Sequence, residues 1–169
     1  IPEDLGGSGD PSPFTAHGVL MGIKASVNKK FGSDNLKGVR VLVQGLGNVG
    51  LNLVNYLHKE KAIITVADID TDKVKRAEEQ FGVKSVAPDD IASQEADVFA
   101  PCALGAVIND ESINKLKVKI VAGGANNQLA EDRHGGILKE MGILYAPDFV
   151  INAGGLMNVF VELEGYSKE

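Results

Sequence analysis

The sequence predicts a doubly wound α/β domain built on a mostly parallel sheet, and three observations support this prediction. Short continuous runs of Val, Ile and other apolar residues alternate along the chain with segments of helical periodicity. Such runs are typical of strands buried on both faces, as in a parallel sheet that helices cover. A glycine-rich turn at residues 45–50 joins the first of these strands directly to a helix. The 169 residues suit one such domain, spanning 1–169.

The chain begins with a segment, residues 1–12, that is rich in Gly, Ser, Asp and Pro, and we expect a linker or loop there. Ser12 and Pro13 then predict a helix, with Ser12 as its N-cap and Pro13 at the first helical position. Apolar residues continue at helical spacing until Gly32 ends the helix. Because the sequence starts with Ile1 rather than methionine, we expect the chain to be part of a longer protein.

Strands and helices are expected to alternate after this first helix. The β-branched and apolar runs predict strands at 39–43, 62–67, 97–100, 119–122, 143–145 and 149–151. Helical spacing predicts helices at 48–59, around Val74–Phe81 up to Gly82, near 110–116, at 130–141, and along the stripe Leu156, Val159, Phe160 and Leu163.

Composition narrows the classes of function. Lys plus Arg number 17 and Asp plus Glu number 23, which leaves a net charge of −6. An acidic balance disfavours broad binding to nucleic acid or to an anionic membrane, because both require a cationic face. No apolar run approaches the roughly 18 residues of a membrane span. The single cysteine, Cys102, allows no internal disulfide and favours a reducing, cytoplasmic compartment.

The glycine turn has the full context of a dinucleotide-binding βαβ unit. A strand precedes Gly45, a helix follows from about Asn48, and a second strand ends at Asp68, 18 residues after Gly50. Gly45 permits the tight turn, Gly47 lets a pyrophosphate approach the backbone, and Gly50 lets the helix pack close to the strand. The first helical turn presents N–H groups and a partial positive charge to phosphate. The intervening loop residues are Leu46, Asn48 and Val49.

Asp68 favours NAD over NADP. A carboxylate at the end of the second strand can accept hydrogen bonds from both adenosine ribose hydroxyls, and it repels a 2′-phosphate. Asp68 could instead cap the next helix, although Asp70 or Thr71 could fill that role. The nearest basic residues, Lys73 and Lys75, leave dual use of NAD and NADP open.

Five segments, in order, carry a resemblance to a known family. They are Gly9-Asp10-Pro11-Ser12-Pro13 with Thr15, residues 43–50, Phe99-Ala100-Pro101-Cys102-Ala103-Leu104-Gly105, Asn126-Asn127-Gln128-Leu129, and Tyr145-Ala146-Pro147-Asp148 leading into Ile151-Asn152-Ala153-Gly154-Gly155. With these segments the chain resembles the Rossmann-type cofactor domain of the glutamate/leucine/phenylalanine/valine dehydrogenases, and within that family most closely the leucine dehydrogenases. Gly50 departs from the leucine dehydrogenase pattern, in which we expect alanine.

The resemblance implies oxidative deamination of an L-amino acid, with hydride passing to the nicotinamide and the imine hydrolysed to a 2-oxo acid and ammonia. It places Thr15 at the nicotinamide carboxamide, Cys102 and Ala103 beside the cofactor, and Asn126 or Asn127 at the nicotinamide ribose or the substrate amino group. On their residues alone, Thr15 fits a first helical turn, Cys102 a small core position, and the asparagines a turn.

The resemblance also implies an apolar substrate pocket lined by Leu156 and Val159, since neither can pair a γ-carboxylate. The same two residues belong to a helical stripe that any packed helix needs. The family's catalytic lysines and aspartate are expected upstream of this chain, so that the chain alone would bind NAD without turnover. The full-length protein is expected to be a homo-oligomer.

Other ionisable residues are assigned no chemistry. Lysines such as Lys29, Lys30, Lys73 and Lys75 are expected on solvated helix faces, and His17, His58 and His134 lack a metal-ligand spacing, so no metal is expected. Two alternatives stay open: a stand-alone dinucleotide-binding regulatory module, and phenylalanine or glutamate specificity within the same family.

Overall fold

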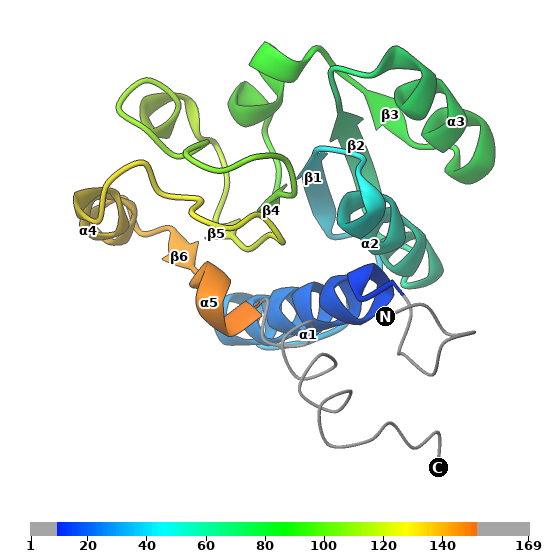
Figure 1. The fold of residues 1–169 in the computed structure, drawn as a ribbon. Helices are drawn as coiled ribbons and strands as arrows, with labels where there is room; N and C mark the ends of the chain where they lie inside the picture. The colour runs from blue at the N-terminus through cyan, green and yellow to red at the C-terminus, as the bar shows by residue number, and fades with distance from the viewer. Residues whose placement is uncertain (1–9, 152–169) are drawn as a thin grey trace, which may run out of the picture.

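The structure, a computed structural model, describes residues 10–151 and contains one six-stranded sheet (Figure 1). All neighbouring strands are parallel, in the order β3-β2-β1-β4-β5-β6. The strands are β1 (Arg40–Gln44), β2 (Ile63–Ala67), β3 (Lys84–Ser85), β4 (Val98–Pro101), β5 (Ile120–Val121) and β6 (Leu144–Tyr145). The order reverses between β1 and β4, which creates a switch point where α/β sheets bind ligands. The doubly wound prediction is confirmed.

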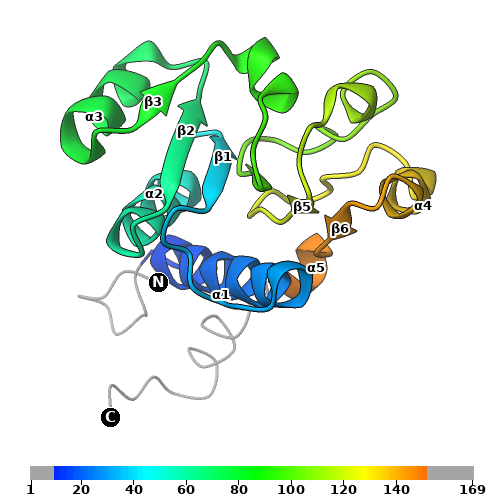
Figure 2. The same ribbon diagram turned by 180° about the vertical axis from the view of Figure 1, so that it is seen from behind.

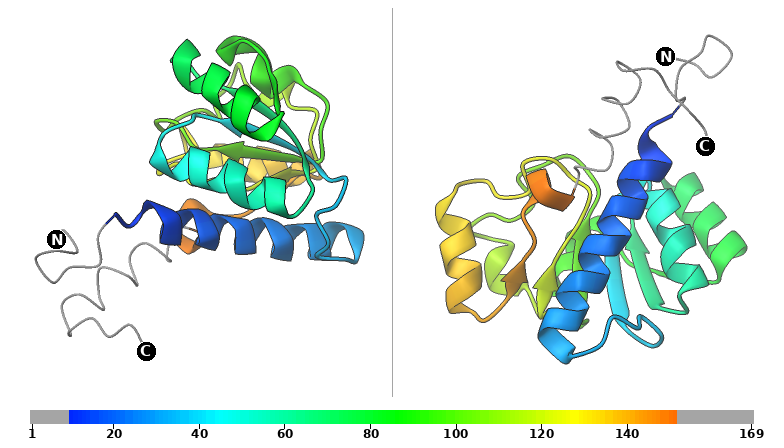
Figure 3. Two further views of the ribbon diagram at one scale, coloured as in Figure 1. Left: turned by 90° about the vertical axis from the view of Figure 1, so that its right-hand side faces the viewer. Right: turned by 90° about the horizontal axis from the view of Figure 1, so that it is seen from below.

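Helices and short 3₁₀ turns cover both faces of the sheet (Figures 1 and 2). The helices are α1 (Ser12–Phe31), α2 (Asn48–Lys59), α3 (Thr71–Phe81), α4 (Arg133–Glu140) and α5 (Asp148–Ile151), and the 3₁₀ turns are η2 (Pro88–Ser93) and η3 (Ile113–Lys115). Helices α1, α2, α3 and α5 contribute to the core on one face, whereas η2, η3 and α4 contribute to the core on the other. Helix α1 lies alongside α2 and contacts α5 (Figure 3).

The central strands explain the continuous apolar runs. Val41 and Val43 of β1 pack into the core beneath α1 and α2, while Leu42 packs into the opposite core. All three side chains are buried. Because successive side chains of a strand point to opposite faces, a strand covered on both faces must be apolar at every position. No helix among residues 10–151 is both long and apolar enough to cross a membrane.

The start of α1 differs from the prediction. Ser12 is already helical, and Pro11 occupies the N-cap position. The side chain of Pro11 makes no capping hydrogen bond. Asp10 takes the expected role of Ser12, because its Oδ1 accepts the backbone N–H of Ser12 at 2.9 Å. The other end agrees with the prediction: Gly32 ends the helix with φ +82°, in the left-handed region that glycine favours.

Two further elements differ from the predictions in type. Residues 149–151, expected as a strand, belong to the single helical turn α5, in which Val150 and Ile151 donate to the Pro147 carbonyl. The expected helix near 110–116 is reduced to η3. The error at 149–151 concerns a short apolar run, for which periodicity cannot separate strand from helix. The segment 110–116 is mostly polar, with only Ile113 and Leu116 apolar, and it forms a single 3₁₀ turn. Strand β3 was not expected at all, since its two residues are exposed and lack an apolar pattern. The stripe from Leu156 to Leu163 lies outside the described residues.

Candidate functional site

A cleft of about 840 Å³ lies at the carboxyl ends of the strands, within the range typical of cofactor sites. Its walls come from the ends of β1, β2 and β4 and from the loop after β5. The lining residues are Gln44, Gly45, Gly47, Ala67, Asp68, Ile69, Asp70, Lys73, Pro88, Cys102, Ala103, Leu104, Gly105, Val107, Gly124, Ala125, Asn126 and Asn127. A second cavity of about 590 Å³ adjoins it and shares Gln44, Pro88 and Val107.

Each of the three loop glycines has a structural reason. At Gly45 and Gly50 a side chain would clash with the backbone, and at Gly47 a side chain would project into the open space beside the loop. Gly45 has φ +96°, and a Cβ there would lie 2.6 Å from the Ala103 nitrogen. A Cβ on Gly50 would overlap the carbonyl oxygen of Gly45, so α2 can approach the turn this closely only without a side chain. A Cβ on Gly47 would meet nothing within 4 Å and would project into open space. That space is where a pyrophosphate would approach the backbone.

Helix α2 begins at Asn48, directly after Gly47, and receives no side-chain hydrogen bond at its cap. Its first turn therefore offers backbone N–H groups to an anion, as the sequence predicts. Leu46 points into the core and is 2% exposed, whereas Asn48 is exposed. Neither residue lines the cleft, nor do Val49 and Gly50, so these four shape the loop rather than the cavity wall.

Asp68 lies one residue past the end of β2 and faces the cleft. Its Oδ2 accepts the backbone N–H of Leu46 at 2.5 Å, and its Oδ1 accepts that of Asp70 at 2.8 Å. An ionised carboxylate has about four acceptor positions, so two such bonds leave capacity for ribose hydroxyls. Asp68 does not cap α3. The side chain of Asp70 does so, by accepting from the N–H groups of Asp72 and Lys73.

Lys73 is partly exposed, as expected of a lysine on a solvated helix face, and it also lines the cleft beside Asp70. Its Nζ lies 3.6 Å from Asp70 Oδ2, and each of the two side chains is 42% exposed. The backbone hydrogen bond from Lys73 is the main cause that holds the pKa of Asp70 below its usual value. The corner at the end of β2 thus contains two carboxylates, Asp68 and Asp70, and one ammonium group.

Cys102 and Ala103 form part of the wall after β4, next to the glycine turn. The N–H of Cys102 donates to the Gln44 carbonyl at 2.7 Å, which continues the pairing of β4 with β1. Burial raises the pKa of the Cys102 thiol to about 11, although the residue keeps some exposure. A thiol with this pKa is almost entirely protonated near neutral pH, which agrees with the interpretation that Cys102 is not a nucleophile.

Asn126 and Asn127 line the other side of the cleft and are exposed. Asn127 has φ +53°, in the left-handed region, where asparagine is better tolerated than most side chains. Gln128 is fully buried below them, and its amide donates to the carbonyls of Gly123 and Ala125 at 2.8 and 3.0 Å. This glutamine therefore determines the path of the loop that presents both asparagines.

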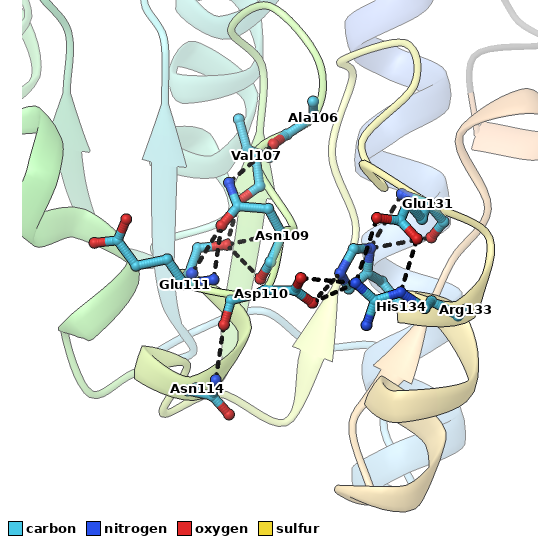
Figure 4. A network of polar contacts seen from close by, with 10 residues as sticks. Ala106, Val107, Asn109, Asp110, Glu111, Asn114, Glu131, Arg133 and His134 are labelled. Carbon is cyan, nitrogen blue, oxygen red and sulfur yellow. Dashed lines mark hydrogen bonds and ion pairs between the residues drawn. The ribbon is translucent and has the colours of Figure 1, made fainter.

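A polar network attaches the loop after β4 to the first turn of α4 (Figure 4). Asp110 accepts two hydrogen bonds from Arg133, each 2.7 Å, and its Oδ1 lies 3.0 Å from His134 Nε2. The hydrogen bond from Arg133 is the main cause that lowers the pKa of Asp110. His134 is buried and its Nδ1 lies 3.0 Å from the backbone nitrogen of Glu131. Its position supports a structural role.

Some predicted residues are not brought to the cleft. Thr15 does not line it, and its hydroxyl donates to the Pro11 carbonyl at 3.1 Å, as the alternative of a first-turn residue implies. Leu156 and Val159 lie outside the described residues. Sequence reasoning missed several lining residues, namely Gln44, Ala67, Ile69, Pro88, Leu104, Gly105, Val107, Gly124 and Ala125. Many of these stand at or just after the carboxyl end of a predicted strand, which was the available signal.

The cleft suits a dinucleotide on its own geometry. The open approach at Gly47, the uncapped first turn of α2 and the pinned carboxylate of Asp68 lie along one edge of the sheet. In addition, Gln44 Oε1 is buried and has no hydrogen-bond partner within the described residues. A buried acceptor without a partner carries a free-energy cost, which a donor from a ligand or a water molecule would relieve.

Curated proteins with similar sequences are amino-acid dehydrogenases. The leucine dehydrogenase of Bacillus subtilis is 57% identical over 169 residues, which cover 100% of this chain and 46% of the relative. The L-tryptophan dehydrogenase of Nostoc punctiforme is 48% identical over 163 residues, 96% of this chain and 46% of the relative. The chain thus spans about half the length of these curated relatives.

Solved structures of amino-acid dehydrogenases also resemble this chain. The crystal structure of L-tryptophan dehydrogenase from Nostoc punctiforme superposes with a TM-score of 0.92 at 47% identity, covering 94% of this chain and 48% of that one. A hetero-hexameric glutamate dehydrogenase from Thermus thermophilus superposes with a TM-score of 0.77 at 27% identity, covering 95% and 41%. A family model described as Glutamate/Leucine/Phenylalanine/Valine dehydrogenase matches residues 6–168. This chain therefore belongs to the glutamate/leucine/phenylalanine/valine dehydrogenase family.

Proposed function

We propose that this chain is the NAD-binding domain of an amino-acid dehydrogenase that reversibly deaminates an apolar L-amino acid, leucine or another branched-chain residue, to a 2-oxo acid and ammonia. The observation that carries the proposal is the pairing of the glycine turn with Asp68 across one cleft, joined by the hydrogen bond from Leu46. That pairing provides a phosphate site and a ribose site at the separation that one βαβ unit dictates.

The residues have distinct tasks in this proposal. Gly47 and the first turn of α2 hold the pyrophosphate, and Asp68 accepts hydrogen bonds from the adenosine ribose. Cys102, Ala103 and the Asn126–Asn127 turn lie on the far wall, where the nicotinamide half would be placed. Thr15 does not line the cleft, and its approach to the carboxamide is proposed on the family resemblance alone. NAD, when bound, supplies the hydride acceptor, while these residues only bind and orient.

The charge at the cleft supports NAD rather than NADP. Asp68 and Asp70 both line the corner at the end of β2, where a 2′-phosphate would be located. Two carboxylates there would repel the phosphate, whereas ribose hydroxyls can donate to them.

The sequence identities favour leucine as the substrate. Leucine dehydrogenases of Bacillus species are 55–57% identical to this chain, compared with 48% for L-tryptophan dehydrogenase and 50% for the phenylalanine dehydrogenase of Lysinibacillus sphaericus. We propose that Leu156 and Val159 line the side-chain pocket, which would exclude a γ-carboxylate. We also propose that the full-length protein is a homo-oligomer.

The first test is a titration of the 169-residue chain with NADH, followed by cofactor fluorescence. Saturable binding to the chain supports the proposal, and absence of binding contradicts it. The same chain should produce no NADH from leucine and NAD, because the family's catalytic lysines are expected in another domain. Leucine-dependent turnover by the chain alone would contradict that part. For the full-length protein, kcat/KM should be higher with leucine than with phenylalanine or glutamate.

A further inference from the structure

The corner of the cleft at the end of β2 contains one cation that the proposed function leaves unexplained. Among the cleft-lining residues in the described part of the chain, Lys73 is the only positively charged one. It lies in the first turn of α3, on the side where the adenosine ribose would be bound by Asp68. A lysine at this place could pair with a 2′-phosphate, which would favour NADP.

In this structure Lys73 is instead paired with Asp70. The two oxygens of Asp70 have different partners: Oδ1 accepts the N–H groups of Asp72 and Lys73 at 3.1 and 3.3 Å, and Oδ2 lies 3.6 Å from Lys73 Nζ. The helix cap therefore fixes the orientation of the carboxylate, and the second oxygen is held toward the ammonium group. A pre-oriented partner costs less side-chain entropy than a flexible one.

Other cations near this corner are placed elsewhere. Lys75 is 73% exposed and lies 4.0 Å from Glu79 on the outer face of α3. Arg76 is exposed and donates to the Asp72 carbonyl at 3.2 Å. Neither residue lines the cleft. The balance of charge at the ribose corner is thus decided by Asp68, Asp70 and Lys73, which together have one net negative charge.

We propose that Asp70 determines cofactor choice by neutralising Lys73, so that a 2′-phosphate meets the charge of Asp68 and no available cation. The inference rests on the proposed binding of NAD in this cleft. Asp68 recognises the ribose directly, whereas Asp70 acts through Lys73 and is a positioning residue. Without the charge of Asp70, the corner is neutral and Lys73 can turn toward a phosphate.

The test compares NADH and NADPH binding to the chain and to its Asp70→Asn variant, by fluorescence of the reduced cofactors. Asparagine caps helices about as well as aspartate, so the start of α3 should be retained. The ratio of the NADPH Kd to the NADH Kd should fall by about tenfold, mostly through tighter NADPH binding. The change should shrink at high salt, because the pair is partly exposed. An unchanged ratio would overturn the inference.

Two further variants separate the ion pair from net charge. Asp72→Asn removes the same charge two residues away, from an exposed residue that does not line the cleft, and should change the ratio less than twofold. An equal effect of Asp72→Asn would overturn the role of Asp70. Adding Lys73→Met to Asp70→Asn should abolish the gain in NADPH affinity. Persistence of the gain would show that Lys73 is not the cation that binds the 2′-phosphate.

The failure of this inference is distinguishable from failure of the proposed function. If the unmodified chain binds neither cofactor, the NAD proposal itself is wrong. If it binds NADH and the Asp70→Asn variant keeps the original preference, only the role of Asp70 is wrong. Asp70→Ser, which also retains a capping side chain, provides a second neutral variant should Asp70→Asn unfold.

Discussion

The carboxylate of Asp68 accepts the backbone N–H of Leu46 at 2.5 Å, and this bond joins the proposed ribose site to the glycine turn. Leu46 is buried in the core, and Asp68 also accepts the N–H of Asp70 through its other oxygen. The residue proposed to bind the ribose therefore also holds the residues proposed to bind the phosphates. Substitutions at Asp68 should therefore affect both the ribose site and the phosphate site.

Asp68→Asn should weaken NADH binding by about 10- to 100-fold, since hydrogen bonds to a charged group contribute about 1.5–3 kcal/mol each. Whichever way the amide turns, its NH₂ group would face the N–H of Leu46 or of Asp70. The free energy of unfolding should also fall, by about 2 kcal/mol, as measured by urea titration. Asp34→Asn, in an exposed loop, is the matched control and should change neither quantity. Unchanged NADH affinity in Asp68→Asn would contradict the assignment.

Gly45→Ala should destabilise the chain by about 3 kcal/mol, because the new Cβ combines a left-handed φ of +96° with a 2.6 Å approach to the Ala103 nitrogen. Thermal unfolding measures the loss, and NADH affinity should decrease with it. Gly136→Ala is the matched control: it is a helical glycine whose added Cβ meets nothing within 4 Å. It should stabilise the chain by about 0.5–1 kcal/mol. Equal effects of the two substitutions would show that steric crowding at Gly45 is unimportant.

Gln128→Ala should destabilise the chain by about 2–4 kcal/mol, because it leaves the carbonyls of Gly123 and Ala125 without these donors and creates a cavity. Since Gln128 supports the Asn126–Asn127 turn, NADH affinity should also fall in the fraction that remains folded. Asn114→Ala removes an exposed amide that donates to the Asp110 carbonyl, and its effect should stay below about 1 kcal/mol. Wild-type stability of Gln128→Ala would contradict this account of the loop.

Cys102 should react slowly with iodoacetamide in the folded chain. Burial raises the pKa of its thiol to about 11, so the thiolate fraction at pH 8 is about 200-fold lower than for an ordinary cysteine. As the chain's single cysteine, it gives an unambiguous signal, and the urea-unfolded chain is the control. Comparable rates in the two states would contradict the assigned environment.

The same shift predicts a pH dependence of stability. The unfolded thiol, with a pKa near 8.5, releases its proton before the folded one, so the folded state binds more protons above that pH. The stabilisation from Cys102 is fully present below about pH 8.5 and is lost as the pH rises toward 11. Urea titrations between pH 8 and 11 should show a steeper decline in the wild-type chain than in Cys102→Ala.

The sequence was sufficient for the features that local physics controls. Continuous apolar runs predicted strands covered on both faces, and the alternation of Val41, Leu42 and Val43 between the two cores explains why. The glycine turn and Asp68 were predictable because their spacing is dictated within one βαβ unit, so neighbouring elements in the chain are also neighbours in space. The resemblance to the dehydrogenase family depended on five such local segments.

Only the tertiary structure decided which residues from distant segments meet. The hydrogen bond of Asp68 with Leu46, the position of Lys73 beside the cleft, and the support of the asparagine turn by buried Gln128 all depend on how loops from separate strands converge at the switch point. Short runs such as 149–151 were mistaken because a few apolar residues satisfy either period, and packing against α1 makes the choice. The sequence places Lys73 on a solvated helix face, and the neighbouring strand ends determine that this face borders the cleft.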